Sequence, residues 1–495
     1  MLGTLINKEL RSIILSPKFT GTFLVCSILI LLSVYTGIRE YRILKARYDA
    51  NDLLVSQELQ QATSWAHLST RVYREPEPLQ IFASGLDYDI GRWTAIASDS
   101  GVKMKHSAYA DDPIFAVFRF LDFSFITRFI LTLFAILFTY NAVSGEREDG
   151  MLKLVFANSV SRAKCIIGKF VGSWLGLVVP ITIPILLGIL LLSVYGITLS
   201  SAEWLRLLLL LLYSLALFTF FIGLGIMISS LCRRSSVSFL ISLVAWVMLV
   251  MIIPRIGVMA AGHIVEVPRV TDIESRLSSY AQSKWDEFNK ASSKRWENYD
   301  EESDDNTGDE SAEVAVLDEE ALWKIIERED SLSTEVEKDI SRYEMKLQED
   351  LRQRKIRQER LAYSLARISP VAAYQFGAMS LAGTGAEIKT RYENAAADFR
   401  NRFNDHVEMQ KRETGDLGRM VVSVAIDDEG NKSTSSVGGR ETGELDLDGL
   451  PKFTPPRPIL AEAVAPTVID FGLLVLFSLI VFAGATAAFM RYDMR

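Results

Sequence analysis

Cysteine and histidine are scarce in this sequence, with three of the first and four of the second among 495 residues. The cysteines, Cys26, Cys165 and Cys232, lie in or beside apolar segments, so the polar segments have no thiol for a disulfide or a zinc site. The histidines are scattered, and neither H-E-x-x-H nor G-x-S-x-G occurs. We therefore expect no metal site and no catalytic residue, and these absences argue against a membrane enzyme.

A nucleotide-binding loop is missing as well. Such a loop has the form G-x-x-x-x-G-K-[ST], in which backbone N–H groups surround the phosphates. The nearest string, AKCIIGKF at 163–170, lacks the first glycine and ends in phenylalanine. We expect this chain to bind no ATP and no other cofactor.

Positive charge is not in excess. The chain has 53 lysines and arginines against 61 acidic residues, which gives a formal net charge of -8. Neutralising the phosphates of a nucleic acid needs a basic face. Nucleic acid is therefore not an expected partner.

Apolar runs are what this sequence has in abundance. Hydrophobic residues make up 49% of it, and stretches almost free of charge alternate with highly charged ones. A bilayer core of about 30 Å needs about 20 mostly apolar residues per helix. Six runs meet this need, at 19–38, 120–143, 166–195, 205–231, 237–256 and 468–490. The composition predicts an all-α integral membrane protein with six transmembrane helices.

The lysines and arginines beside these runs predict the orientation, because retained positive charge marks the cytoplasmic side. They are frequent in 1–18, 144–165 and 491–495, and absent from the loop near 198–203. Four basic residues just after 38 count against this orientation, although long translocated segments tolerate them. We expect a multi-pass protein of the plasma (bacterial inner) membrane with both termini cytoplasmic. No cleavage motif follows the first run, so we expect that run to be retained.

This orientation places two large segments, 39–119 and 257–467, outside the cytoplasm. The first predicts a packed cap without assigned chemistry. In the second, apolar positions at helical spacing predict helices at 270–299 and 322–351 that form an antiparallel hairpin, with the acidic run 300–310 as its solvated tip. A third helix is predicted at 386–407 and a short strand at 420–426.

Three ionisable residues near span ends need partners, because unpaired charge is costly at membrane depth. These are Asp122, Arg128 and Asp470. We expect pairing at the interface or between helices.

The most informative stretch is the predicted cytoplasmic loop between the second and third runs, AVSGEREDGMLKLVFANSVSRAKCIIGKF at 142–170. An acidic start broken by glycine leads into a short apolar surface that would enter the membrane interface or a groove on a partner. That surface comprises Met151, Leu152, Leu154, Val155 and Phe156. An ordinary polar loop with a few buried apolar residues explains the composition equally well.

This stretch resembles the signature of ABC-2 type permeases, E-x-E-x-G-T-L-x-x-L-L-x-x-P-x-x-R-x-x-x-x-x-G-K. It is matched by Glu146, Glu148, Gly150, Leu152, Arg162, Gly168 and Lys169, while Met151 replaces the usual threonine. Residues 1–18 look like the cytoplasmic elbow helix of that family. The stretch 369–385 resembles a subgroup whose last extracellular loop is expanded into a helical domain.

The resemblance implies a coupling helix that docks in a groove on a cytoplasmic ATPase subunit. Glu146, Glu148 and the helix from Met151 to Asn158 would contact that partner, which would bind the ATP and the Mg²⁺. Two copies of the ATPase and a second permease, either identical or a similar paralogue, would complete the complex. Membrane lipid is a further expected partner, and a periplasmic protein is a candidate.

The expected function is that of a permease subunit that moves a hydrophobic or lipid-like substrate. Apolar span residues such as Phe129, Phe134, Phe138 and Leu186 suit such a cargo, although plain helix packing explains them equally well. The alternative is a mechanotransmission complex that drives the extracytoplasmic domain, or a partner of it, without solute transport.

Overall fold

A computed structural model of the chain describes residues 2–65, 68–88, 90–96, 121–157, 161–305, 319–414, 421–426, 432–437, 445, 447 and 449–491. Across these residues the chain is mainly helical, with two small antiparallel β-hairpins. It divides into two compact units. Unit 1 comprises Met1–Ile253 with Arg367–Arg495, and unit 2 comprises Pro254–Ala366.

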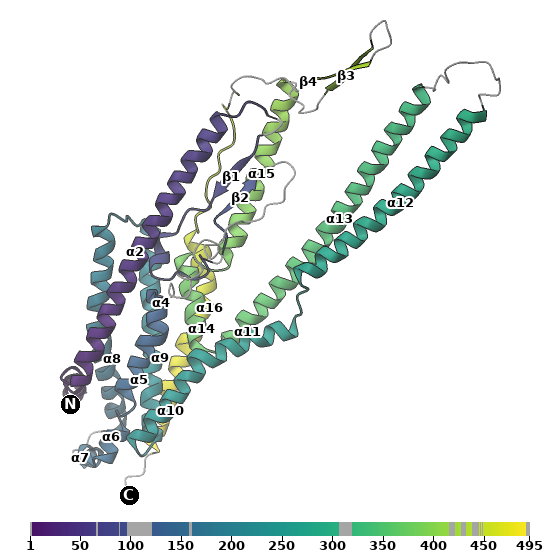
Figure 1. The fold of residues 1–495 in the computed structure, drawn as a ribbon. Coiled ribbons are helices and arrows are strands. Elements are labelled where there is room, and N and C mark those ends of the chain that lie inside the picture. Colours follow the sequence, from purple (N-terminus) through teal and green to yellow (C-terminus); the bar gives the residue numbers. More distant parts are fainter. Residues whose placement is uncertain are drawn as a thin grey trace. The chain divides into compact units, whose positions relative to one another are not determined.

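Among the residues that the structure describes, six helices or helical runs are long and apolar enough to cross a membrane (Figure 1). Three are single helices of unit 1: α8 (Arg162–Val194), α9 (Ser201–Leu231) and α16 (Leu460–Met490). A fourth is α2 (Pro17–Gln60). The second run in the chain joins α4 (Phe123–Phe125), the π-helix η2 (Ile126–Leu131), α5 (Thr132–Thr139) and α6 (Ser144–Glu148). The fifth joins α10 (Ser235–Val247), the π-helix η3 (Met248–Ile252) and α11 (Ile253–Ile264). The prediction of an all-α protein with six spans is confirmed.

The first span is part of a longer helix than the apolar pattern indicated. Helix α2 starts where the Ser16 side chain accepts the Phe19 N–H at 3.2 Å, with Pro17 at the first helical position. It continues past residue 38 to Gln60, because the polar sequence that follows is free of proline and glycine and rich in good helix formers. Loss of hydrophobicity therefore ended the predicted span but not the helix.

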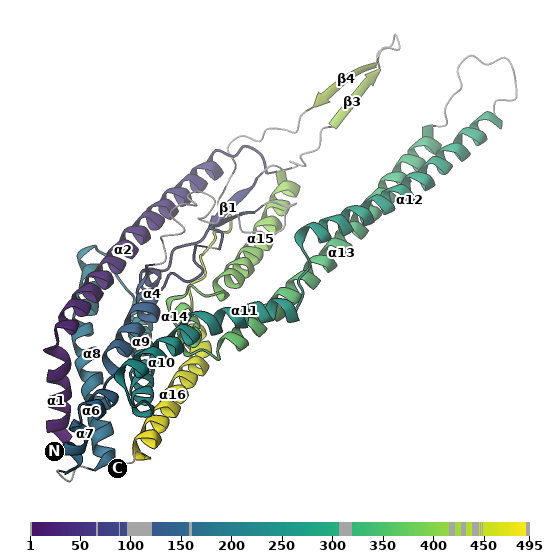
Figure 2. The ribbon, with the colours of Figure 1, turned by 60° about the horizontal axis from the view of Figure 1, so that its bottom comes forward.

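The predicted hairpin of unit 2 is formed by α12 (Val270–Asp305) and α13 (Glu319–Ala366), which lie side by side in Figure 2. Tyr280 stacks on Tyr343 with ring centroids 4.1 Å apart, and Arg295 pairs with Glu329 at 2.6 Å. Because the later residue of α12 meets the earlier residue of α13, the two helices run antiparallel. Of the predicted acidic tip, residues 306–310 lie outside the described part of the chain.

The stretch expected as one domain at 257–467 is divided in the structure, because residues from Arg367 onward belong to unit 1. Helix α14 (Pro370–Ala382) is almost wholly buried and packs against α9 and α16. The Tyr374 hydroxyl lies 3.0 Å from the Ser214 hydroxyl of α9. Arg367 pairs with Asp470 of α16 through Nε at 2.5 Å and Nη2 at 3.1 Å. The expectation of a partner for Asp470 is thus met by the residue that leads into α14.

A small packed layer of unit 1 combines the hairpin of β1 (Thr70–Tyr73) and β2 (Trp93–Ile96) with α15 (Glu387–Thr414). The Tyr392 hydroxyl of α15 donates to the Val72 carbonyl of β1 at 2.6 Å. Buried Asp87 pairs with Arg74 at 2.5 Å and with Arg92 at 2.7 Å. The short 3-10 helix η1 (Pro78–Ile81) follows β1. A second hairpin pairs β3 (Val421–Ile426), where a strand was predicted, with β4 (Lys432–Val437).

Candidate functional site

The signature loop folds into two short helices, α6 (Ser144–Glu148) and α7 (Met151–Ala157), joined by a tight turn. Gly150 in the turn has a φ of +71°, in the left-handed region that residues with a side chain rarely adopt. No atom lies within 4 Å of the position a Cβ would occupy there. The glycine is therefore required by the backbone conformation and not by crowding. The turn lies at the same end of unit 1 as both chain termini (Figure 1).

Helix α6 is fixed to the ends of the neighbouring spans. The backbone N–H groups of Val143 and Ser144 both donate to the Ser229 hydroxyl of α9 at 3.0 Å. The Arg147 guanidinium donates to the Cys232 carbonyl, just past the end of α9, at 2.9 Å. The Glu148 carboxylate accepts the N–H of Ser235, the first residue of α10, at 3.1 Å. A carboxylate at a helix N-terminus is also favoured by the helix dipole.

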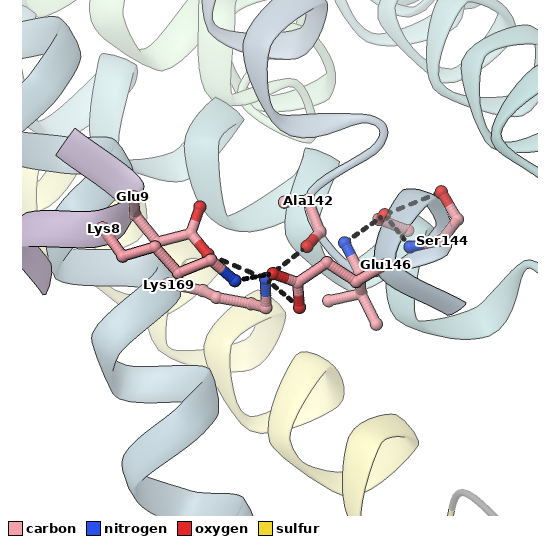
Figure 3. Close-up of polar contacts among 8 residues, drawn as sticks. Lys8, Glu9, Ala142, Ser144, Glu146 and Lys169 are labelled. Carbon is pink, nitrogen blue, oxygen red and sulfur yellow. Dashed lines mark hydrogen bonds and ion pairs between the residues drawn. The ribbon is translucent and has the colours of Figure 1, made fainter. Parts of the chain in front are cut away.

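Four charged residues from three elements meet beside α6 and form what we call the charge cluster (Figure 3). Lys169 of α8 pairs with Glu9 of α1 (Leu2–Ile14) at 2.9 Å and with Glu146 of α6 at 2.7 Å. Its ammonium also donates to the Ala142 carbonyl at 2.6 Å. Lys8 of α1 pairs with the other oxygen of Glu146 at 2.7 Å.

The four members of the cluster differ in burial, and this decides which of them matters most. The Lys169 side chain is only 3% exposed, whereas Lys8 is 42% exposed. An exposed ion pair contributes about 0–1 kcal/mol. Removing one partner from a buried pair costs about 3–5 kcal/mol, because it leaves uncompensated charge away from water. Lys169 is therefore the residue that holds α1, α6 and α8 together.

A row of glycines on α8 lets α1 approach closely enough for this pairing. Gly168, Gly172 and Gly176 are spaced by four and lie on one helix face. A Cβ on Gly168 would lie 3.0 Å from the Leu5 Cβ, and one on Gly172 would lie 2.6 Å from the Glu9 Cβ. The contacts advance along both helices together, so α1 runs parallel to the start of α8.

The remaining residues of the signature have separate positions. Leu152 is 1% exposed, whereas Met151 is 43% exposed. Arg162 donates to the Met490 carbonyl, at the C-terminal end of α16, at 2.5 Å, a favourable place for a cation. Leu154 belongs to α7, and Asn158 lies outside the described residues. The structure thus joins Glu146 to Lys169, while Glu148 contacts α10 and Arg162 contacts α16.

Two contributors to the site, Glu9 and Ser229, were not singled out from the sequence. Lys169 lies near the start of the predicted apolar run 166–195, and its need for a buried counter-charge could have indicated an acidic partner. Nothing in the local sequence marks Ser229, which lies 85 residues beyond Ser144.

The model of the ABC-2 family transporter proteins matches residues 4–494. This chain belongs to that family. No curated protein matches its sequence. Members of the family are the membrane components of ABC transporters and not the ATPases, and they typically work with an ATPase subunit.

An apolar recess of about 320 Å³ opens among the spans of this ABC-2 protein. Its walls come mainly from α8 and α9, including Leu186 and Leu212. Phe123 and Leu131 of the second span also line it. Of the other apolar residues considered for cargo, Phe134 packs against Phe138 with ring centroids 4.9 Å apart.

The two ionisable residues of the second span do not form an ion pair in the described part of the chain. The Asp122 carboxylate accepts the N–H of Phe125 at 2.6 Å and so caps α4. Its other oxygen accepts the Ser84 N–H and hydroxyl at 2.9 and 2.8 Å. The Arg128 guanidinium lies over the Phe129 ring, 5.5 Å from its centroid.

Proposed function

We propose that this chain is the permease subunit of an ABC transporter and that α6 and α7 dock on a separate cytoplasmic ATPase subunit, which binds the ATP and the Mg²⁺. The observation that carries the proposal is that α6 is fixed to neighbouring helices while the turn that follows it is exposed. Residues 148–151 at the α6–α7 turn are exposed, while α6 itself is bonded to α1, α8, α9 and α10. A force applied at the turn would reach four helices through short polar contacts.

These polar contacts between α6 and its neighbours favour movement of the helices as a group. The Lys169 pairs would make α1 and α8 follow α6, and the Ser229 contacts would do the same for the end of α9. The Glu148 bond would transmit the displacement to α10. In this mechanism closure of an ATPase dimer tilts the spans and opens a cavity between two permeases toward the outside.

A hydrophobic or lipid-like substrate is the cargo that the recess supports. Its lining is aliphatic and aromatic apart from hydroxyl groups such as Thr182 and Ser214, and such a surface binds apolar groups and offers few partners to charged ones. Membrane lipid is the nearest source of such groups.

The assembly we propose has two permeases, either identical or paralogous, and two ATPase subunits in the plasma (bacterial inner) membrane. Both termini and the α6–α7 turn would face the cytoplasm. The segments 39–119 and 257–467 would lie outside the cytoplasm, where a periplasmic protein could bind.

Co-purification tests the docking proposal. We expect Met151→Arg to lose the ATPase subunit, because it places a charge in the docking surface without breaking any contact described above. Leu231→Arg is the matched control, since Leu231 is an exposed apolar residue at the end of α9. Charge reversal at Glu146 and Glu148 should also abolish coupling, and normal ATP turnover in the doubly reversed complex would refute the docking assignment.

Mechanotransmission is the second candidate, and the hairpin of unit 2 favours it. Its helices contain 36 and 48 residues, and such long paired helices suit the transmission of force more than the lining of a solute path. ATPase activity in liposomes separates the two functions. Stimulation by a lipophilic solute, with its movement, supports transport, whereas ATP hydrolysis without binding or movement of solute supports mechanotransmission.

A further inference from the structure

A second, polar cavity of about 570 Å³ lies in unit 1 where α9 begins. Its walls come from α2, the segment between β1 and η1, the start of α9, α15, and the segment 455–458. The volume is within the usual range of small-molecule sites, about 300–1,000 Å³. The apolar recess described above has different lining residues, so the two are separate features.

Arg206 of α9 is the central charged residue of this cavity. Its side chain is only 3% exposed. It has one near carboxylate, Glu77, at 3.4 Å, and a more distant one, Glu203, at 3.8 Å. Its Nε and Nη1 are buried without a hydrogen-bond acceptor in the described part of the chain. A buried donor without an acceptor costs about 1–3 kcal/mol, so this arginine has unused capacity to bind an anion.

Two acidic residues of the cavity, Glu75 and Glu203, are engaged in other contacts. Glu75 pairs with Lys45 at 2.9 Å and with Arg457 at 3.3 Å. Glu203 accepts the Ser200 N–H at 2.6 Å in the capping box that starts α9. The buried nitrogens of Arg206 therefore remain donors without acceptors in the described part of the chain, and a ligand that uses them must supply acceptor oxygens.

We propose that this cavity binds an anionic phosphodiester headgroup, one whose negative charge no ammonium group of the same headgroup offsets, with the Arg206 guanidinium as its anchor and Arg391 and Arg457 at its rim. A guanidinium matches the geometry of phosphate oxygens and forms charge-assisted hydrogen bonds with them. The site lies at the polar start of α9, one of the helices long and apolar enough to cross a membrane. The headgroup belongs either to a membrane lipid or to a soluble phosphodiester.

Glu77 gives this binding a pH dependence. Burial raises the pKa of Glu77 to about 7, although Arg206 opposes the shift. The other titratable groups that face it are Glu203, Arg391, Arg457 and Tyr41. As the pH falls through 7, Glu77 takes up a proton and its repulsion of a bound anion disappears. Binding should therefore strengthen on acidification.

The test uses the full chain in lipid nanodiscs. The soluble probe is glycerophosphoglycerol, whose single negative charge stays constant between pH 6 and 8. The lipid probe is phosphatidylglycerol, compared with phosphatidylcholine discs by the midpoint of thermal unfolding. Binding of the soluble probe supports the proposal and identifies a soluble phosphodiester as a source of the headgroup. A midpoint of unfolding that is higher in phosphatidylglycerol than in phosphatidylcholine, without binding of the soluble probe, supports the proposal and identifies a membrane lipid. Failure of both probes overturns it.

Substitutions inside and outside the cavity test whether any binding that is measured occurs there. Arg206→Gln should weaken binding about tenfold to a hundredfold, which is the usual worth of hydrogen bonds to a charged group. Arg402→Gln, at an exposed position on α15 outside the cavity lining, is the control and should bind like the wild type. Equal binding by Arg206→Gln and the wild type overturns the proposal.

Arg391→Gln and Arg457→Gln decide the matter if Arg206→Gln does not fold, since both arginines are more exposed than Arg206 and their removal costs less stability. We expect each to weaken binding, and wild-type affinity in both overturns the proposal. Glu77→Gln should bind at pH 8 as the wild type does at pH 6, with no further change on acidification. Wild-type affinity that falls on acidification contradicts the anion site. Coupling to the ATPase is a separate property, so failure here leaves the proposed function untouched.

Discussion

Replacing Lys169 by glutamine is the most informative single change to the charge cluster. The substitution leaves the carboxylates of Glu9 and Glu146 without the ammonium group with which both of them pair. Breaking a buried ion pair in this way costs about 3–5 kcal/mol. The remaining Lys8–Glu146 pair is partly exposed and would recover less than about 1 kcal/mol of this. We therefore expect a local destabilisation of about 3 kcal/mol.

Hydrogen exchange of the purified protein measures this effect where it occurs. The amides of residues 2–14 and 144–148 should exchange about a hundredfold faster in Lys169→Gln, because about 2.7 kcal/mol of lost local stability corresponds to that factor. The amides of α15 should be unchanged. Lys18→Gln, which alters an exposed lysine next to α1, is the control and should behave like the wild type.

A double-mutant cycle separates the ion pair from other effects of the substitution. Glu9→Gln added to Lys169→Gln removes the carboxylate that the first change left unpaired, so it should restore part of the protection. The reasoning is refuted if Lys169→Gln exchanges like the wild type in both segments, or if Glu9→Gln adds its full destabilisation to that of Lys169→Gln.

Two further predictions concern the glycine row and the packed β layer. Gly172→Leu should detach α1 from α8, since even a Cβ would lie 2.6 Å from that of Glu9, and limited proteolysis should then cleave within residues 2–14 while α15 stays intact. Asp87→Asn should destabilise the β1–β2 layer by about 3–5 kcal/mol, measured by hydrogen exchange of Tyr392 and its neighbours. Burial alone would raise the pKa of Asp87, but the nearby guanidinium groups of Arg74 and Arg92 hold it below the ordinary value for an aspartate. The stabilisation from the Asp87 ion pairs should therefore persist above about pH 4 and be lost only as the pH falls through the lowered pKa of Asp87. Faster hydrogen exchange in this layer already between pH 7 and 5 would contradict the assignment of Asp87 as a buried, ionised partner of the two arginines.

The spans and the hairpin could be predicted because their signals are local. About 20 apolar residues suffice to indicate a span, and apolar positions such as Tyr280 and Tyr343 at helical spacing indicate paired helices. The length of α2 could not be predicted in the same way, since hydropathy reports the solvent and not the backbone conformation. The burial of α14 was missed for a related reason. Its sequence is short for a span, and only its contacts with α9 and α16 place it in unit 1.

The candidate site was predicted in part. The family signature marked Glu146 and Lys169, but their pairing depends on how two helices meet and not on sequence spacing. The partner Glu9 lies 160 residues away from Lys169 along the chain. The spacing of the glycines at 168, 172 and 176 is visible in the sequence, yet the sequence does not indicate which helix packs against them. Long-range contacts of this kind need the fold.

The central claim is that the α6–α7 turn binds an ATPase subunit, and site-specific photocrosslinking in native membranes tests it most directly. A photoreactive amino acid at Met151 is compared with one at Met409 of α15, two methionines of similar exposure, at 43% and 50%. We predict that the Met151 derivative forms an adduct with a protein that binds ATP, that the yield changes when ATP is added, and that the Met409 derivative does not form this adduct. The claim is contradicted if position 151 gives no such adduct while position 409 does.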